Sequence, residues 1–231
     1  MTVTSRAGAR NASRRQRDAL RPASRRRDGP AGCYRGDVGD AAEDRRRALY
    51  EAYQRVPQHQ RAEIIRGTLY VMPRPAPRHA NAASVLGVEL GGPFQRGRGG
   101  PGGWWILDEP ELHLVPLEPM VPDLAGWRVE RMPQLPETAF FTLVPDCVCE
   151  VLSKSTENVD QNEKLPIYAE QGVRHVWLVD PIAQTLEVHA LGDDARWREV
   201  RVYAGDARVR AEPFAAVEVE LAALWSPPTR S

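Results

Sequence analysis

The sequence predicts an α/β fold, because a strand, a helix and a second strand follow one another past the midpoint of the chain. Cys147 to Leu152 and Val173 to Val179 are short apolar runs rich in strand-forming residues. Between them, Ser155 or Thr156 can cap a helix, and Gly172 is well placed to end it. A strand, a helix and a strand with short connections make a right-handed parallel crossover, which is the unit of an α/β sheet.

Other segments with helical spacing or strand-forming composition supply the rest of the domain. Before the crossover we expect a helix from Asp44 to Gln54, a hairpin from Ala62 to Met72 that turns at Gly67, a helix from His79 to Leu90 stopped by Gly91-Gly92-Pro93, and one meander with strands at Trp104 to Leu107, Glu111 to Val115 and Val121 to Arg128. After it we expect strands at Thr185 to Ala190, Trp197 to Tyr203 and Ala207 to Arg210, and a closing segment from Phe214 to Trp225.

Charge divides the chain into two parts. The net charge is zero, but residues 1–47 carry +7 and residues 48–231 carry −7. Residues 1–44 are rich in Arg, Ala, Gly and Ser and too poor in large apolar residues to form a core, so we expect a disordered tail before a folded domain over residues 45–231. No apolar run has the length of a membrane span, and the tail lacks the apolar stretch of a signal peptide. We therefore expect a cytoplasmic protein with no membrane partner.

Two carboxylates on predicted strands indicate a reactive centre. Glu150 lies inside the first strand of the crossover, where burial is costly unless the carboxylate is paired, protonated or bound to a metal. Alternate residues from Val148 to Leu152 share its face of the strand. Asp123 lies on another predicted strand, and two carboxylates together suit Mg²⁺ or Mn²⁺, which can activate water for attack on a phosphodiester. The plain alternatives are a Glu150 paired with an arginine and an Asp123 that only makes a turn.

A lysine is the third group that this chemistry usually needs, to steady the attacking water or the developing negative charge. Among 31 basic residues only Lys154 and Lys164 are lysines, and the rest are arginines, which do not usefully change their protonation. Lys154 falls in the turn after the strand, where we expect it to face solvent. Lys164 falls in the following helix. Either lysine can instead be an ordinary surface residue.

Residues from 48 to about 225 resemble the Uma-type family of putative restriction endonucleases, within the PD-(D/E)XK nuclease superfamily. The resemblance depends on an ordered string of short motifs. They are Ala62-Glu63-Ile-Ile-Arg-Gly67, Arg78-His79, Val121-Pro122-Asp123, Pro145-Asp146, Glu150-Val-Leu-Ser153, Ser155-Thr156, Asp160, Lys164, Tyr168-x-x-x-Gly172 and Trp177-Leu-Val-Asp180-Pro181.

The resemblance implies a restriction-endonuclease-like core, in which a mixed central sheet of four strands is flanked by helices. It implies hydrolysis of DNA phosphodiester bonds with a divalent metal held by Asp123 and Glu150, and Lys164 as the third catalytic residue. Glu63 and Asp160 would support the site, since Asp160 stands one helical turn before Lys164. The usual superfamily lysine would stand two residues after Glu150, where this chain has Leu152.

Three classes of function follow from these observations. The first is a magnesium-dependent DNA endonuclease, with DNA as its partner and room for a homodimer. The second is a catalytically inactive module of the same fold that binds nucleic acid or protein, favoured by Leu152 and by the acidic body. The third, a small-molecule-binding α/β domain, would need a glycine-rich turn between a strand and a helix, which the sequence lacks.

The basic tail is expected to raise DNA affinity without reading bases, because clustered arginines release counterions from the phosphate backbone. The alternatives are a solvated extension without a role and a start codon set too early. Deleting residues 1–44 should lower the affinity for duplex DNA and flatten its dependence on salt. An unchanged affinity and an unchanged salt slope would reject a role for the tail in binding.

Overall fold

The computed structural model describes residues 37–57, 59–72 and 74–225, and those from residue 38 onward belong to one compact unit. Within this described part of the chain, no helix is long and apolar enough to cross a membrane. The expected disordered tail lies outside the described residues, apart from residues 37–44.

Those eight residues are helical, so the first helix begins before Asp44, where the sequence predicts its start. Helix α1 spans Asp37–Gln54 and begins before Asp44. Glu43 and Arg47 lie one turn apart on it, with Oε1 and Nε separated by 3.4 Å. Such a pair adds a few tenths of a kcal/mol to an exposed helix, which helps to extend α1 toward the N-terminus.

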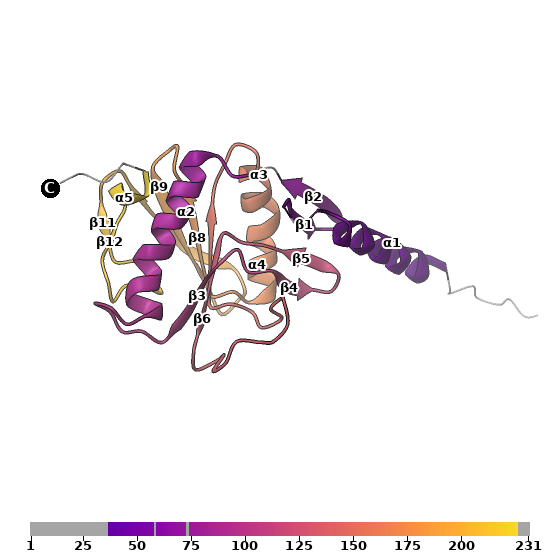
Figure 1. Ribbon diagram of the computed structural model, residues 1–231, viewed down its shortest axis with the longest axis horizontal. Helices are drawn as coiled ribbons and strands as arrows, with labels where there is room; N and C mark the ends of the chain where they lie inside the picture. Colours follow the sequence, from indigo (N-terminus) through magenta and orange to yellow (C-terminus); the bar gives the residue numbers. More distant parts are fainter. Residues whose placement is uncertain (1–36, 58, 73, 226–231) are drawn as a thin grey trace, which may run out of the picture. The chain divides into compact units, whose positions relative to one another are not determined.

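A six-stranded sheet forms the centre of the domain, in the order β10-β9-β8-β7-β6-β3 (Figure 1). All neighbouring pairs are antiparallel except β7 with β8, so the sheet is mixed. Its strands are β3 (Trp104–Asp108), β6 (Leu124–Arg128), β7 (Cys147–Val151), β8 (His175–Asp180), β9 (Thr185–Leu191) and β10 (Trp197–Ala204). A mixed sheet flanked by helices confirms the expected fold class, with six strands where the resemblance implies four.

The predicted crossover joins β7 to β8 through a helical segment of three parts. These are α3 (Glu157–Val159), the π-helical turn η2 (Asp160–Lys164) and α4 (Leu165–Gln171). Pro166 stands at the start of α4 and has no N–H to donate to the preceding turn, which accounts for the wider turn before it. Gly172 ends α4 in the left-handed conformation with φ of 82°, as the sequence predicts.

The two faces of the sheet are covered by different helices. The odd-numbered residues of β7 pack in one apolar cluster with α2 (Pro77–Leu90). Val148 packs in a second cluster that includes Tyr168 of α4. Because side chains alternate along a strand, Glu150 points to the same side as Val148, toward α4.

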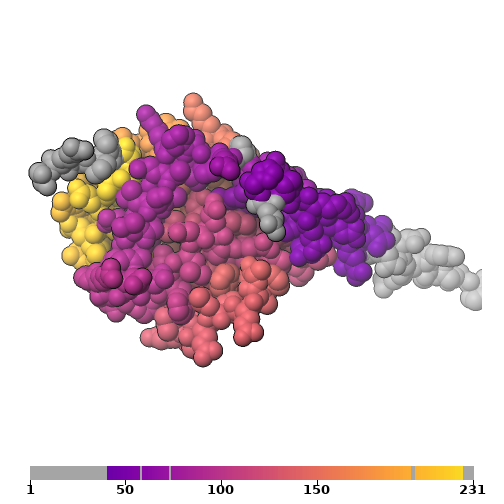
Figure 2. All heavy atoms as spheres, viewed as in Figure 1, coloured from indigo at the N-terminus to yellow at the C-terminus, as the bar shows by residue number. Residues whose placement is uncertain are grey.

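Helix α2 is also held by the C-terminal segment. Asn81 donates a hydrogen bond of 2.9 Å from Nδ2 to the carbonyl oxygen of Leu224 in α5 (Ala222–Trp225). Figure 2 shows the two segments side by side, with α2 in magenta and the C-terminal segment in yellow. A small two-stranded sheet, β11 (Arg208–Val209) with β12 (Val219–Glu220), precedes α5.

The expected single meander is wrong, because its strands divide between two sheets. β3 pairs with β6 in the central sheet, whereas β4 (Leu112–Val115) and β5 (Glu118–Met120) form a separate hairpin. The strand β6 begins at Leu124, so Asp123 lies just before it rather than inside it. The first hairpin is confirmed, as β1 (Arg61–Ile65) and β2 (Thr68–Met72).

The sequence Gly91-Gly92-Pro93 does not stop the helix as expected. Helix α2 continues into the π-helical turn η1 (Gly91–Gln95), and Gly91 keeps helical angles with φ of −66°. Proline cannot donate a backbone hydrogen bond, and the ladder continues with a wider step from the N–H of Arg96 to the carbonyl of Gly91 at 3.0 Å.

Replacement of Gly172 by alanine should destabilise the fold by about 1 kcal/mol, because a Cβ disfavours the left-handed conformation at this position. Space is not the cause, since no atom lies within 4 Å of a Cβ built there. Gly91→Ala is the matched control, because that glycine has the same free space but helical angles. Its stability should stay level or rise. Urea unfolding of both variants tests the pair, and equal effects would contradict this account of the helix end.

Candidate active site

A single lysine stands at the centre of a buried acidic group. The Nζ of Lys164 lies 3.0 Å from Oε1 of Glu63, 3.1 Å from Oε1 of Glu150 and 3.3 Å from Oδ1 of Asp160. The side chains of Lys164, Glu63 and Glu150 are each 1% exposed. These residues come from η2, from β1 and from β7, so the group ties the first hairpin and the crossover helix to the central sheet.

Lys164 therefore reaches the carboxylate that the sequence singles out. Burial lowers the pKa of its ammonium, but Glu150, Glu63 and Asp160 together raise that pKa well above its usual range, so the lysine stays charged. Lys154, by contrast, is exposed in the turn after β7. Leu152 is 5% exposed and packs in the core on the α4 side, which leaves Lys164 as the ammonium beside Glu150.

Glu150 has two partners on one oxygen. Its Oε1 accepts a hydrogen bond of 2.6 Å from the hydroxyl of Tyr168, in addition to the contact with Lys164. Burial raises the pKa of Glu150 to about 8, and Lys164 lowers it only in part because Asp160, Asp123 and Glu63 repel the charge. The alternative in which an arginine pairs with Glu150 is therefore wrong.

The arginine of the site pairs with Asp123 instead. Nη1 of Arg61 lies 2.8 Å from Oδ1 of Asp123, and Nε2 of His79 lies 3.0 Å from the same oxygen. The other oxygen, Oδ2, accepts a hydrogen bond of 2.7 Å from the backbone N–H of Val151. Burial opposes ionisation, but the hydrogen bond from His79 and the charge of Arg61 hold the pKa of Asp123 well below its usual range.

Asp123 lies close to Glu150. Leu124 is opposite Cys149 in the antiparallel pair of β6 and β7, and Asp123, just before β6, accepts a hydrogen bond from the N–H of Val151, the residue that follows Glu150. The charge of Asp123 also contributes to the raised pKa of Glu150. All five of the expected site residues, Glu63, Asp123, Glu150, Asp160 and Lys164, are buried in this part of the fold.

Sequence reasoning assigned no role to three other contacts of the site. Arg61 precedes Glu63 by two residues, and this strand spacing could have shown that their side chains share a face. His79 and Tyr168 belong to the motifs of the family resemblance but were not linked to a carboxylate. Their contacts span 44 and 18 residues, which a local pattern does not reveal.

The unused oxygens of the site decide whether it fits a metal. Oε2 of Glu63 and Oε2 of Glu150 are buried and accept no hydrogen bond among the described residues. Mg²⁺ prefers oxygen ligands and is often bound by one or two carboxylates together with waters and substrate phosphates. No group of three or more acidic, histidine or cysteine residues in the described chain could hold a metal ion. The free oxygens of Glu63 and Glu150 therefore fit a site of two carboxylates completed by non-protein ligands. Asp123 would join such a site by sharing an oxygen that already accepts a hydrogen bond.

The mixed sheet with helices on both faces is a nuclease-like fold. A crystal structure of a putative nuclease belonging to DUF820 from Anabaena variabilis ATCC 29413 matches it with a TM-score of 0.59 and 21% sequence identity, covering 77% of this chain and 97% of that chain. The family Uma2, described as "Putative restriction endonuclease", matches residues 48–223. The chain therefore belongs to this family, as the ordered motifs predict. No curated protein matches the chain.

The pKa of Glu150 predicts how stability changes with pH in the absence of divalent cations. The folded state raises this pKa from 4.5 to about 8, so the folded protein keeps a proton that the unfolded chain releases. The contribution of this group to the free energy of unfolding should be fully present below about pH 4.5 and lost as pH rises through about 8.

Urea unfolding of the wild type and Glu150→Gln in EDTA, over this pH range, measures that contribution. The glutamine does not titrate, so the variant should lose less stability as the pH rises. Identical pH slopes for the two proteins would contradict the raised pKa.

Proposed function

We propose that this protein is a metal-dependent endonuclease that hydrolyses DNA phosphodiester bonds, with Mg²⁺ or Mn²⁺ as its cofactor. The observation that carries the proposal is the ammonium of Lys164, held 3.1 Å from Glu150 in a buried acidic group. Asp123 is held next to Glu150 by the hydrogen bond from the N–H of Val151, so two carboxylates and one lysine lie in the same part of the fold. Membership of a family of putative restriction endonucleases supports DNA as the substrate.

Asp123 and Glu150 are the residues that would hold the metal. When bound, the metal supplies a water of lowered pKa and offsets charge on the phosphoryl oxygens. Glu150 keeps Oε2 for this role, because its Oε1 is already held by Tyr168 and Lys164. Asp123 is kept ionised and oriented by Arg61 and His79.

Lys164 is assigned the electrostatic role. Its ammonium remains charged among three carboxylates, and Glu63 and Asp160 fix its position from two sides. A charge held in place in a water-excluded site stabilises negative charge that develops on the phosphate, without reorganising at the moment of reaction. Lys164 thus supplies the positive charge that Leu152, at the usual position of the superfamily lysine, cannot supply.

The second candidate is a binding module of the same fold that does not cut DNA. It is favoured by one observation, that no three-ligand metal group occurs among residues 37–57, 59–72 and 74–225. In such a module, Lys164 would act only as the internal counter-ion that allows Glu63, Glu150 and Asp160 to be buried.

Nicking of supercoiled plasmid DNA separates the two candidates. The wild type should cut with Mg²⁺ or Mn²⁺, and Glu150→Gln should cut about 100-fold more slowly or not at all, because it removes a charged metal ligand while keeping the side-chain shape. Lys164→Met should lower the cutting rate by a similar factor. Removal of its charge leaves buried carboxylates unpaired and can cost about 3–5 kcal/mol of stability, so its folding is checked by urea unfolding at the assay temperature.

Arg208→Met is the matched control, because it removes an exposed cation that pairs with Glu218 and Glu220 at the protein surface. It should cut like the wild type. Absence of cutting by the wild type with either metal, at protein concentrations that bind the plasmid, would reject the nuclease and favour the binding module.

A further inference from the structure

A large pocket adjoins the candidate active site. It encloses about 990 Å³ and is reached from the carboxylate Asp123 through Arg61 and His79, which both line it. The turn that follows β7 and the residues that follow β8 also line it. The pocket therefore lies at the carboxyl ends of the two parallel strands β7 and β8.

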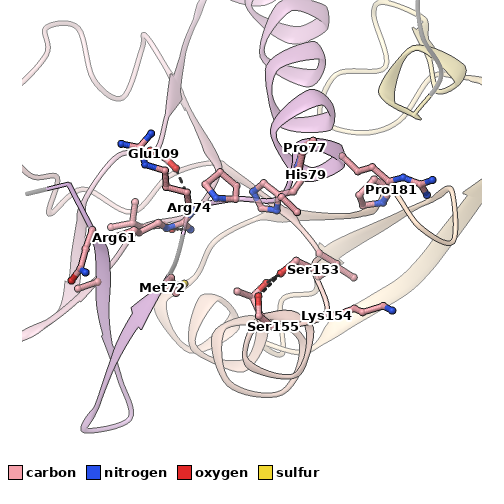
Figure 3. A pocket seen from close by; sticks show the side chains of 18 of the residues that line it. Arg61, Met72, Arg74, Pro77, His79, Glu109, Ser153, Lys154, Ser155 and Pro181 are labelled. Carbon is pink, nitrogen blue, oxygen red and sulfur yellow. Dashed lines mark hydrogen bonds and ion pairs between the residues drawn. The ribbon is translucent and has the colours of Figure 1, made fainter.

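Two chain segments form facing walls of the pocket (Figure 3). Arg74, in the connection from β2 to α2, lies on one side together with Pro77 and His79 in the first turn of α2. Ser153, Lys154 and Ser155, in the turn after β7, lie on the other side. The second wall directly follows β7, the strand that contains Glu150.

The lining is apolar in part and bordered by cations. Met72, Ala76 and Ile182 supply apolar surface, and Ile182 is 52% exposed. The exposed cations on the lining are Arg74, Arg78 and Lys154.

These three cations are available to an anionic ligand. No carboxylate among the described residues pairs with Arg74, Arg78 or Lys154. The two acids of the lining, in contrast, are already engaged. Oε1 of Glu109 lies 3.4 Å from Nη1 of Arg61, and Oε1 of Glu111 lies 2.6 Å from Nε2 of His113.

A fully paired duplex does not match such a pocket. Its outer surface consists of sugars and phosphates, and its bases are stacked inside, so it could use the cations but would leave the apolar surface uncovered. An unpaired nucleotide presents both a flat apolar base and a phosphate. Proteins that bind single strands combine a positively charged groove with surfaces on which bases pack.

We propose that this pocket binds unpaired nucleotides of the DNA strand next to the bond that is cut, so that single-stranded or flapped DNA is preferred to a continuous duplex. This assignment rests on the proposed function, because it takes DNA as the substrate. The bases lie on Met72, Ala76 and Ile182, and the phosphates contact Arg74, Arg78 and Lys154. The pocket thereby sets which DNA form reaches Asp123 and Glu150.

Fluorescence anisotropy in EDTA tests the preference without any cutting. The probes are a labelled single strand of about 12 nucleotides and a blunt duplex of the same sequence, a length within the range that single-strand sites cover. The single strand should bind at least about tenfold more tightly, the change that one well-packed base can supply.

Ile182→Ser should remove exposed apolar surface from the pocket and weaken binding of the single strand by about tenfold while leaving the duplex unaffected. Val88→Ser is the matched control, because Val88 is 71% exposed on α2 and is not part of the lining. It should bind both probes like the wild type. Equal affinity of the wild type for the two probes, or an Ile182→Ser variant that binds the single strand normally, would overturn the assignment.

The failure of this proposal is distinguishable from failure of the nuclease. If the protein nicks plasmid but shows no preference for the single strand, the proposed function is supported and the pocket assignment is rejected. If the protein binds the single strand through the pocket but cuts no DNA with Mg²⁺ or Mn²⁺, the nuclease function is rejected and the pocket assignment is supported.

Discussion

The burial of Lys164 among three carboxylates is the interaction on which the arrangement of this domain depends. Four ionisable groups leave water together, and each is acceptable in the core only because the others are present. The group joins β1, β7 and η2, which are far apart in the sequence. Loss of the ammonium would expose the remaining carboxylates to mutual repulsion in a medium of low polarity.

Strand pairing explains how the side chains of the candidate site are oriented. The parallel pairing of β7 with β8 fixes where the crossover helix returns, and the alternation along β7 turns Glu150 toward that helix. Asp123 is brought close to Glu150 because it immediately precedes β6, which pairs antiparallel with β7. Two separate pairing rules therefore bring two carboxylates together beside a pocket that is bordered by exposed cations.

Much of this could be predicted from sequence because the signals are local. The crossover, the face of Glu150 and the helical spacing of Asp160 from Lys164 follow from strand and helix periodicity. The division of the expected meander into two sheets could not be predicted, because strand pairing is decided by tertiary contacts. The contact of Arg61 with Asp123 could not be predicted for the same reason, because it joins residues that are 62 positions apart.

The account places a divalent cation beside a lysine that already neutralises part of the acidic charge. Anomalous scattering from crystals soaked in Mn²⁺ tests this most directly, because it locates the ion without depending on activity. The account predicts a Mn²⁺ ion bonded to carboxylate oxygens of both Asp123 and Glu150, with the Lys164 ammonium still beside Glu150. A soaked crystal with no Mn²⁺ at these two carboxylates would contradict it.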